Sequence, residues 1–210
     1  MRRSKEDADA TRTSILNAAE WLFSTQGIAS TRLIDVANRA EVTRGAIYWH
    51  FKNKEEIINA IIDRLVTPSE AAIETFFKSG ETNPSVTIET LRDIVLQGLI
   101  RLRTDCSAKQ GTRLILRYSL CAESKSVASK LENEREAGLN RIYRFLDIAK
   151  SQGYLRSDYS VEAMSLHVRA HITGLYHHFL SDPEKYPSDN HLKESLDMLF
   201  SGLSVPSVPS

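Results

Sequence analysis

The chain has 210 residues, of which 41% are hydrophobic, and its 27 Lys and Arg residues balance its 27 Asp and Glu residues. This composition supplies enough apolar material for a buried core, in one domain or in a small domain fused to a larger one. No run of about eighteen apolar residues is present, which excludes a membrane-spanning helix. The N-terminus also lacks the apolar region of a signal peptide, so we expect a cytoplasmic protein without a membrane partner.

The balanced total hides an uneven distribution of charge along the chain. Residues 1 to 54 contain nine basic and six acidic residues, a net charge of +3, and residues 55 to 210 carry the opposite net charge of −3. A basic segment is typical of contact with a polyanion such as nucleic acid. The charge pattern therefore singles out the first quarter of the chain.

The N-terminal segment leads into a first predicted helix. Residues 1 to 8 are charged, and Arg2, Arg3 and Lys5 either reach a phosphate or the minor groove or form a solvated tail. From Asp9 to Gln26, apolar residues recur at helical spacing, and Gly27 is a natural end for the helix. We expect this helix to cover the segment that follows.

Residues 31 to 54 contain two short helical patterns joined by a tight connection. The first begins after Ser30 and Thr31, which are good helix caps, and ends near residue 40. Thr43 can cap the second, whose apolar side is supplied by Ala46 and Ile47. Helices this short are unstable alone and must pack on each other and on a neighbour. The pattern predicts a helix-turn-helix.

Several side chains of this segment suit contact with double-stranded operator DNA. Arg44 can reach guanine edges, Thr43 a thymine methyl group or a phosphate, and Gly45 permits close approach of the backbone. Basic and aromatic residues after the second helix are typical phosphate contacts. The alternative is that the aromatic residues close the domain core, which we favour for Phe51 and leave open for Trp49. The predicted DNA contacts are Thr31, Arg32, Thr43, Arg44, Gly45, Tyr48, Trp49, His50, Lys52 and Lys54.

This segment resembles the DNA-binding part of the TetR family. The run VTRGAIYWHFKNKEEI, preceded by T-x-x-x-x-V-A-x-x-A, is similar to the AcrR-like repressors of multidrug efflux pumps, as are the opening RRSKEDADATRTSILNAAEWLFSTQG and the late ITGLYHHFL. Glu41 departs from the pattern, because the family usually has a turn glycine there. If the turn requires a positive φ, Glu41 strains it.

The next predicted helix leaves the basic segment. Asn53 can cap it, with Glu56 three residues on, and an isoleucine-rich stripe follows as far as residue 65. Thr67, Pro68 and Glu70 then form the signature of a new helix start, so we predict a kink or break at Pro68. It is either a hinge, as the resemblance to a linking helix implies, or an exposed helix end.

The remainder of the chain is predicted to be helical throughout. Apolar stripes recur from 86 to 102, 161 to 180 and 191 to 203. A helical pattern also runs from 114 to 122, and a strongly charged helix is expected from about 124 to 152. We expect an all-α fold with a helix-turn-helix domain over 1–54, a helical ligand-binding and dimerisation domain over 55–203, and a disordered tail over 204–210.

We expect a homodimer because of the way in which a short recognition helix reads DNA. One short recognition helix contacts few bases, so specific binding usually needs two half-sites and two joined copies. The last two predicted helices have more apolar surface than one core requires, which suits an interface between copies. The alternative is that these faces form internal core and the protein is a monomer. The predicted interface residues are Leu175, Phe179, Leu192, Leu196, Leu199 and Phe200.

The larger domain contains no catalytic motif, so we expect neither an enzyme nor a cofactor. Aromatic and polar residues on its apolar helices either belong to the core or line a cavity for a small molecule. The resemblance implies a cavity for hydrophobic or amphipathic inducers between these helices. The predicted cavity residues are Phe76, Phe77, Tyr118, Cys121, Ile172, Thr173 and Tyr176.

A metal-responsive regulator is the alternative function. His167 and His171 lie one helical turn apart and could hold a transition metal, although no acidic or thiol side chain is spaced to complete a site. Cys106 and Cys121 are expected to be reduced, without a metal or redox role. The sequence thus favours a DNA-binding repressor that a small inducer releases from its operator.

Overall fold

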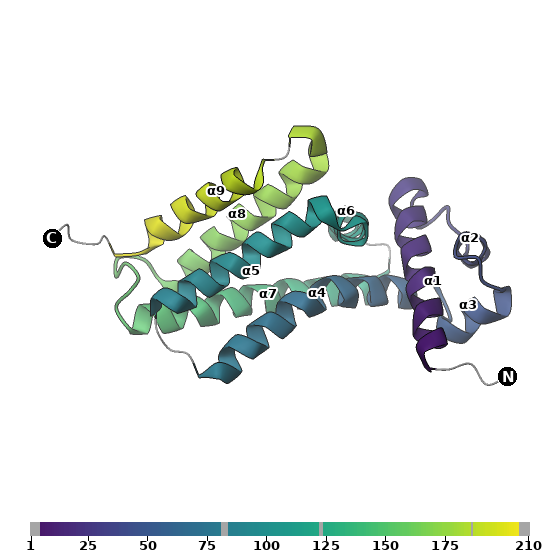
Figure 1. Ribbon diagram of the computed structural model, residues 1–210, viewed down its shortest axis with the longest axis horizontal. Coiled ribbons are helices and arrows are strands. Elements are labelled where there is room, and N and C mark those ends of the chain that lie inside the picture. The colour runs from purple at the N-terminus through teal and green to yellow at the C-terminus, as the bar shows by residue number, and fades with distance from the viewer. Residues whose placement is uncertain (1–4, 81–83, 122–123, 186, 206–210) are drawn as a thin grey trace. The chain divides into compact units, whose positions relative to one another are not determined.

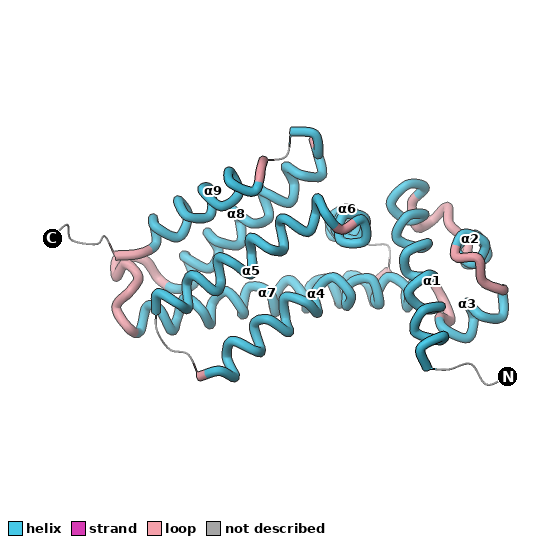
Figure 2. Tube along the Cα trace, viewed as in Figure 1, coloured by secondary structure: helices cyan, strands magenta, loops and turns pink. Residues whose placement is uncertain are grey.

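The computed structural model describes residues 5–80, 84–121, 124–185 and 187–205, and these residues form helices joined by loops (Figure 2). The predicted all-α fold is confirmed. The helices, in chain order, are α1 Lys5–Gln26, α2 Leu33–Arg39, α3 Arg44–His50, α4 Lys54–Ser79, α5 Pro84–Thr104, α6 Cys106–Cys121, α7 Lys125–Ser151, α8 Val161–Ser181, the short 3-10 helix η1 Pro183–Lys185, and α9 Asp189–Leu203.

Local capping explains where several helices begin. The Thr43 hydroxyl accepts a hydrogen bond from the Ala46 amide at 3.2 Å, and Asn53 Oδ1 accepts one from the Glu56 amide at 2.9 Å. Ser160 caps α8 in the same way, through the Ala163 amide. Such side chains satisfy amide groups that the first helical turn leaves without a partner. The predicted caps of α3 and α4 are therefore confirmed.

The sequence predicts a kink or break at Pro68. The break is wrong, because α4 runs through this residue as one continuous helix, and the kink stays a prediction. A proline inside a helix removes one amide donor and costs about 3 kcal/mol. Pro68 is exposed to solvent. The Thr67 hydroxyl donates to the Asp63 carbonyl at 2.7 Å within the same helix. Helical structure is thus continuous on both sides of the proline.

The chain divides into two compact units, and the first combines residues 1–67 with residues 105–132. Its core contains the apolar faces of α1 to α3 and of the first part of α4, together with Leu114 of α6 and Val127 of α7. The Ser24 hydroxyl donates to Gln110 Oε1 at 2.5 Å, which joins α1 to α6. A Cβ on Gly111 would lie 2.6 Å from Leu65 Cδ1, so α6 also approaches α4 closely.

This division differs from the predicted boundary after residue 54. The first part of α4 buries Ile57, Ile58, Ile61 and Ile62 in the same core as the helix-turn-helix. The hydrophobic core therefore continues past the end of the helix-turn-helix motif, and the compact unit is longer than that motif. Residues far along the chain, in α6 and α7, complete that unit.

The second unit combines residues 68–104 with residues 133–210. Helices α5, α8 and α9 run beside one another in it (Figure 1). The rings of Phe76 and Phe145 stack at 4.9 Å within its core. The Val205 amide donates a hydrogen bond to the Tyr154 carbonyl at 2.9 Å, and Leu155 and Ser204 form an isolated antiparallel β-bridge. The predicted disordered tail therefore begins too early, because backbone bonds hold residues 204 and 205; residues 206–210 lie outside the described part.

Candidate nucleic-acid interface

Helices α2 and α3 have seven residues each and depend on the core beneath them. Val36, Ala37 and Ile47 are fully buried and join the two helices to α1 and α4. At the start of α2, Asp35 accepts a hydrogen bond from the Arg32 amide at 2.9 Å and also binds the Arg32 side chain. The pair is therefore held as a rigid support for whatever α3 exposes.

Helix α3 exposes a basic and aromatic surface. Tyr48 is 48% exposed and Trp49 is 73% exposed, while Arg44 places its guanidinium 5.8 Å from the centre of the Tyr48 ring. Gly45 and Lys52 are also exposed. We call these five residues, Arg44, Gly45, Tyr48, Trp49 and Lys52, the α3 surface.

The structure settles the question left open for the aromatic residues. Phe51 is only 3% exposed and belongs to the core, whereas Trp49 points outward and its ring meets that of His50 edge to face at 4.5 Å. His50 itself is half-buried. The indole N–H of an exposed tryptophan can donate a hydrogen bond to a phosphate of a nucleic acid.

Two predicted DNA contacts make hydrogen bonds within the protein. Thr31 is fully buried and its hydroxyl donates to the Gly27 carbonyl at 2.8 Å. The Lys54 ammonium donates to the Ile28 carbonyl at 2.7 Å and so fixes the loop between α1 and α2. Both side chains satisfy carbonyl groups of that loop, which helical spacing cannot reveal. Arg32, by contrast, remains 77% exposed at its side chain while paired with Asp35.

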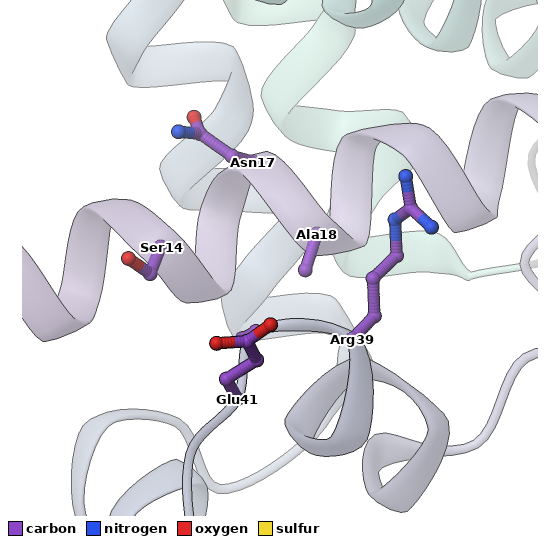
Figure 3. A pocket seen from close by; sticks show the side chains of 6 residues that line it. Ser14, Asn17, Ala18, Arg39 and Glu41 are labelled. Atoms are coloured by element: carbon purple, nitrogen blue, oxygen red, sulfur yellow. The ribbon is translucent and has the colours of Figure 1, made fainter.

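The connection between α2 and α3 has the backbone form that a turn glycine would favour. Glu41 has a φ of +56° and is the only non-glycine residue with positive φ in the described part of the chain. Its carboxylate and the Arg39 side chain line a shallow hollow against Ser14, Asn17 and Ala18 of α1 (Figure 3). The turn therefore keeps its shape in spite of the residue at this position.

Sequence reasoning missed a buried ion pair inside the first unit. Glu20 of α1 is 1% exposed and contacts the Arg64 guanidinium of α4, which also donates to Asn17 Oδ1 at 2.7 Å. Burial raises the pKa of the Glu20 carboxyl, and the nearby Arg64 opposes that rise. The only signal was a charged residue on an otherwise apolar helix face. The pair fixes the position of α1 on α4.

The structure distributes the predicted cavity residues between the two units. Phe76, Phe77, Ile172, Thr173 and Tyr176 belong to the second unit, where Phe77 meets both Phe76 and Phe145. Tyr118 packs against the core of the first unit instead. The side chain of Cys121 lies outside the described residues. Whether these residues line one cavity therefore stays a prediction.

Most predicted interface residues are used inside the chain itself. Phe179, Leu192, Leu196, Leu199 and Phe200 are buried in the core of the second unit, and Leu175 is half-buried against it. The five buried side chains are therefore not available as a surface. The large apolar residues that α8 and α9 expose are Leu166, at 63%, and Met198, at 76%, and the exposed Ala170 and Gly174 follow Leu166 at four-residue spacing.

The two histidines considered for metal binding lie on α8 in the second unit. His167 is exposed, and His171 Nε2 lies 3.0 Å from the Ser195 hydroxyl of α9. Among the residues whose positions are described, no group of three or more His, Cys, Asp and Glu side chains could hold a metal ion. His171 thus has an ordinary hydrogen-bonding neighbour, and the described residues offer the histidine pair no third ligand.

Comparison with known proteins identifies the family that shares this architecture. The family model for bacterial regulatory proteins of the tetR family matches residues 15–61, which run from α1 into α4. A solved complex of SmeT with triclosan is 30% identical over 96% of this chain and 98% of that chain, with a TM-score of 0.80. The chain belongs to the TetR family. It is therefore a member of a family of DNA-binding transcriptional regulators.

Similarity to TetR-family relatives extends over almost the whole chain. BepR, a transcriptional repressor of Brucella suis, is 29% identical over 208 residues, which is 98% of each protein. AcrR of Shigella flexneri is 28% identical over 204 residues, 95% of this chain and 92% of that one. The resemblance to the AcrR-like subgroup is confirmed by these relatives. Within the described residues, no helix has the length and apolar character needed to span a membrane.

Proposed function

We propose that this TetR-family protein is a ligand-responsive, sequence-specific repressor of a multidrug efflux operon. The observation that carries the proposal is the exposed α3 surface on a capped helix with a rigid base. SmeT, a structural relative, is the repressor of a multidrug efflux pump of Stenotrophomonas maltophilia, and one of its structures is a complex with triclosan. By analogy, small hydrophobic or amphipathic molecules release this protein from its operator.

The residues of the α3 surface suit two kinds of DNA contact, with bases and with phosphates. Arg44 is at the N-terminal end of α3, which is the end that helix-turn-helix proteins insert into the major groove. Its guanidinium can bind a guanine edge in two places, while Gly45 allows the backbone to approach. Lys52 and Tyr48 are suited to phosphates and fix the position of the helix. Two copies are needed to read two half-sites.

Release by an inducer follows from two states with different DNA affinity. Helices α4 and α7 each contribute residues to both compact units, so an event in the second unit has a covalent, helical route to the first. An inducer that binds the non-operator state better lowers DNA affinity by that difference alone. No further energy source is required.

Fluorescence anisotropy with DNA from upstream of the protein's own gene tests this function. The titration uses the operator candidate and a scrambled duplex at about 150 mM salt, where non-specific contacts weaken. It is repeated with hydrophobic cations, phenols and amphipathic acids. Specific binding that one class reverses is the expected result. Equal binding to both duplexes, followed by a random-oligonucleotide selection that yields no preferred site, would refute a sequence-specific regulator.

Replacement of Arg44 tests the role of the α3 surface. We expect Arg44→Ala to weaken operator binding by roughly 1 to 3 kcal/mol and to relax specificity at one position of each half-site. The matched control is Arg117→Ala, which removes an exposed arginine of α6. Operator affinity equal to that of the parent protein would remove Arg44 from the set of base contacts.

A further inference from the structure

Helix α8 carries an arginine whose side chain reaches into the second unit. The guanidinium of Arg169 crosses α7 at Gly138, where an added Cβ would lie 2.6 Å from Nη1 of Arg169. The same Cβ would lie 3.8 Å from Nη2 of Arg141. The absence of a side chain at Gly138 therefore makes room for two guanidinium groups that converge on one point. Arg169 is half-buried there.

The two arginines differ in how their charges are balanced. Arg141 forms ion pairs with Glu70 at 2.7 Å and with Glu134 at 3.9 Å. Arg169 has no ion pair and no side-chain hydrogen bond with any residue that the structure describes. Burial and the charges of Arg135 and Arg141 lower the pKa of Arg169, and Tyr176 opposes that shift. Arg169 is thus a half-buried cation without an anionic partner among the described residues.

Beyond Arg169, the same face of α8 carries mainly apolar side chains. Ile172, Thr173 and Tyr176 follow Arg169 at spacings of three, four and seven residues, so all four share one side of the helix. The Tyr176 hydroxyl would be 3.3 Å from a Cβ on Gly98 of α5, and it makes no hydrogen bond within the described residues. Ile172 and Tyr176 pack against the core of the unit.

We propose that Arg169 and the Tyr176 hydroxyl bind the carboxylate of an amphipathic organic acid, whose apolar body lies along Ile172 and the Tyr176 ring, and that this acid is the inducer. The inference rests on the proposed function, since it names the chemical class of that inducer. A half-buried charge without a partner is destabilising, and a bound carboxylate removes the cost. The planar guanidinium and a carboxylate also match in geometry.

Other ligand classes fit this site less well. A neutral ligand leaves the Arg169 charge unbalanced, and a cationic ligand adds a second positive charge beside Arg169. A second copy of the chain could instead supply an acidic side chain to Arg169 when α8 and α9 pair. That arrangement predicts a change in oligomeric state when Arg169 is replaced, which a carboxylate ligand does not.

Calorimetric titration of the purified full chain, without DNA, tests the proposal. The probes are decanoate, 1-decanol and decylammonium at pH 7.5, which share an apolar chain and differ in the charge of the head group. Decanoate is expected to bind at least tenfold more tightly than decanol, and decylammonium more weakly than both. Equal affinity for the three probes, preference for the cation, or binding of none of them overturns the proposal.

Three variants identify the residues responsible. Arg169→Met should bring decanoate affinity down to that of decanol, with decanol binding unchanged and the melting temperature of the ligand-free protein raised. Gly138→Ala displaces the Arg169 guanidinium while favouring helix, so it should weaken decanoate alone. Arg117→Met, which removes one exposed charge from α6, is the control and should keep the preference for decanoate.

Sedimentation velocity and DNA binding separate the remaining outcomes. If Arg169→Met changes the oligomeric state, Arg169 pairs with a second copy and the proposal fails. If decanoate binds but no duplex is preferred, the ligand site stands and the proposed repressor function fails. If the operator is bound specifically but decanoate neither binds nor releases it, the repressor stands and the assignment of an acidic inducer fails.

Discussion

Glu41 occupies a backbone conformation that costs an ordinary residue free energy. Its φ of +56° brings Cβ close to the following carbonyl oxygen, a contact that glycine avoids. The sequence indicated the problem, because the related pattern has glycine here, and it did not indicate which way the turn would adjust. The turn has the positive-φ conformation despite the strain, because buried side chains of α2 and α3 fix the backbone on either side of Glu41.

We expect Glu41→Gly to raise the free energy of unfolding by up to about 1 kcal/mol, because glycine adopts positive φ without strain. Urea unfolding at pH 7.5 measures the change. Glu41→Ala is the matched control, since it removes the carboxylate and keeps Cβ. An equal gain in the alanine variant would show that charge, and not backbone strain, is responsible.

His171 makes the stability of the second unit depend on pH. Burial lowers the pKa of His171 from its ordinary value of 6.5, and the neighbouring His167 lowers it further. The folded protein thus prefers neutral His171, and the unfolded chain binds more protons between the two pKa values. We expect the free energy of unfolding to fall as pH decreases below about 6.5.

Urea unfolding between pH 7.5 and 5.5 checks this prediction. The loss of stability toward low pH should be smaller in His171→Gln than in the parent protein. His191→Gln, at an exposed histidine of α9, is the matched control. An identical loss in His171→Gln and the parent would contradict a role for His171.

At the scale of elements, α4 shows where local signals and tertiary packing disagree. Thr67, Pro68 and Glu70 form a sound signal for a helix start, yet the helix is continuous. Isoleucines before Pro68 bind α4 to the first core, and Ile73 and Phe76 after it bind α4 to the second. Packing on both sides outweighs the proline. The boundary between the two compact units falls at this residue.

Pro68→Ala should stabilise α4, by at most about 3 kcal/mol, because alanine restores an amide donor to the helix. If the proline eases bending between the two units, the variant should change the inducer response more than the operator affinity. Urea unfolding measures the first effect and anisotropy with and without inducer the second. An unchanged induction curve would count against Pro68 as a hinge.

The elements also show how far the sequence alone could predict the site. Periodicity and caps located the helices, and the helix-turn-helix motif located Arg44, Tyr48 and Lys52 on an exposed surface. Periodicity could not reveal that Thr31 and Lys54 bind loop carbonyls, because those partners are set by the tertiary fold. It also could not distinguish the core side of α8 from its exposed side, since both sides are apolar.

At the scale of the whole molecule, the exposed apolar residues of α8 and α9 favour pairing of two copies. Leu166 and Met198 are large apolar side chains that face solvent in the single chain, and Ala170 and Gly174 permit close approach of a second helix. The interface that we propose therefore uses this surface. Phe179 and Leu196 support it from within, as part of the core below.

Leu166→Glu should convert the dimer to a monomer in sedimentation velocity and lower operator affinity at least tenfold, because each copy then reads one half-site. Val205→Glu adds the same charge at a half-exposed apolar residue elsewhere in the second unit and is the control. Circular dichroism verifies that both variants are folded. A Leu166→Glu protein that remains dimeric would place the interface elsewhere.

The use of α6 in the first core has a practical consequence for engineered regulators. Leu114 and Val127 belong to the same core as the helix-turn-helix, and Gly111 lets α6 approach Leu65. A recognition module excised after residue 54 or 67 would leave an apolar cavity where these side chains belong, and would be prone to aggregate. Chimeric repressors that transplant this reader onto another sensor should carry residues 105–132 with it, and the graft should be designed as two chain segments and not as one.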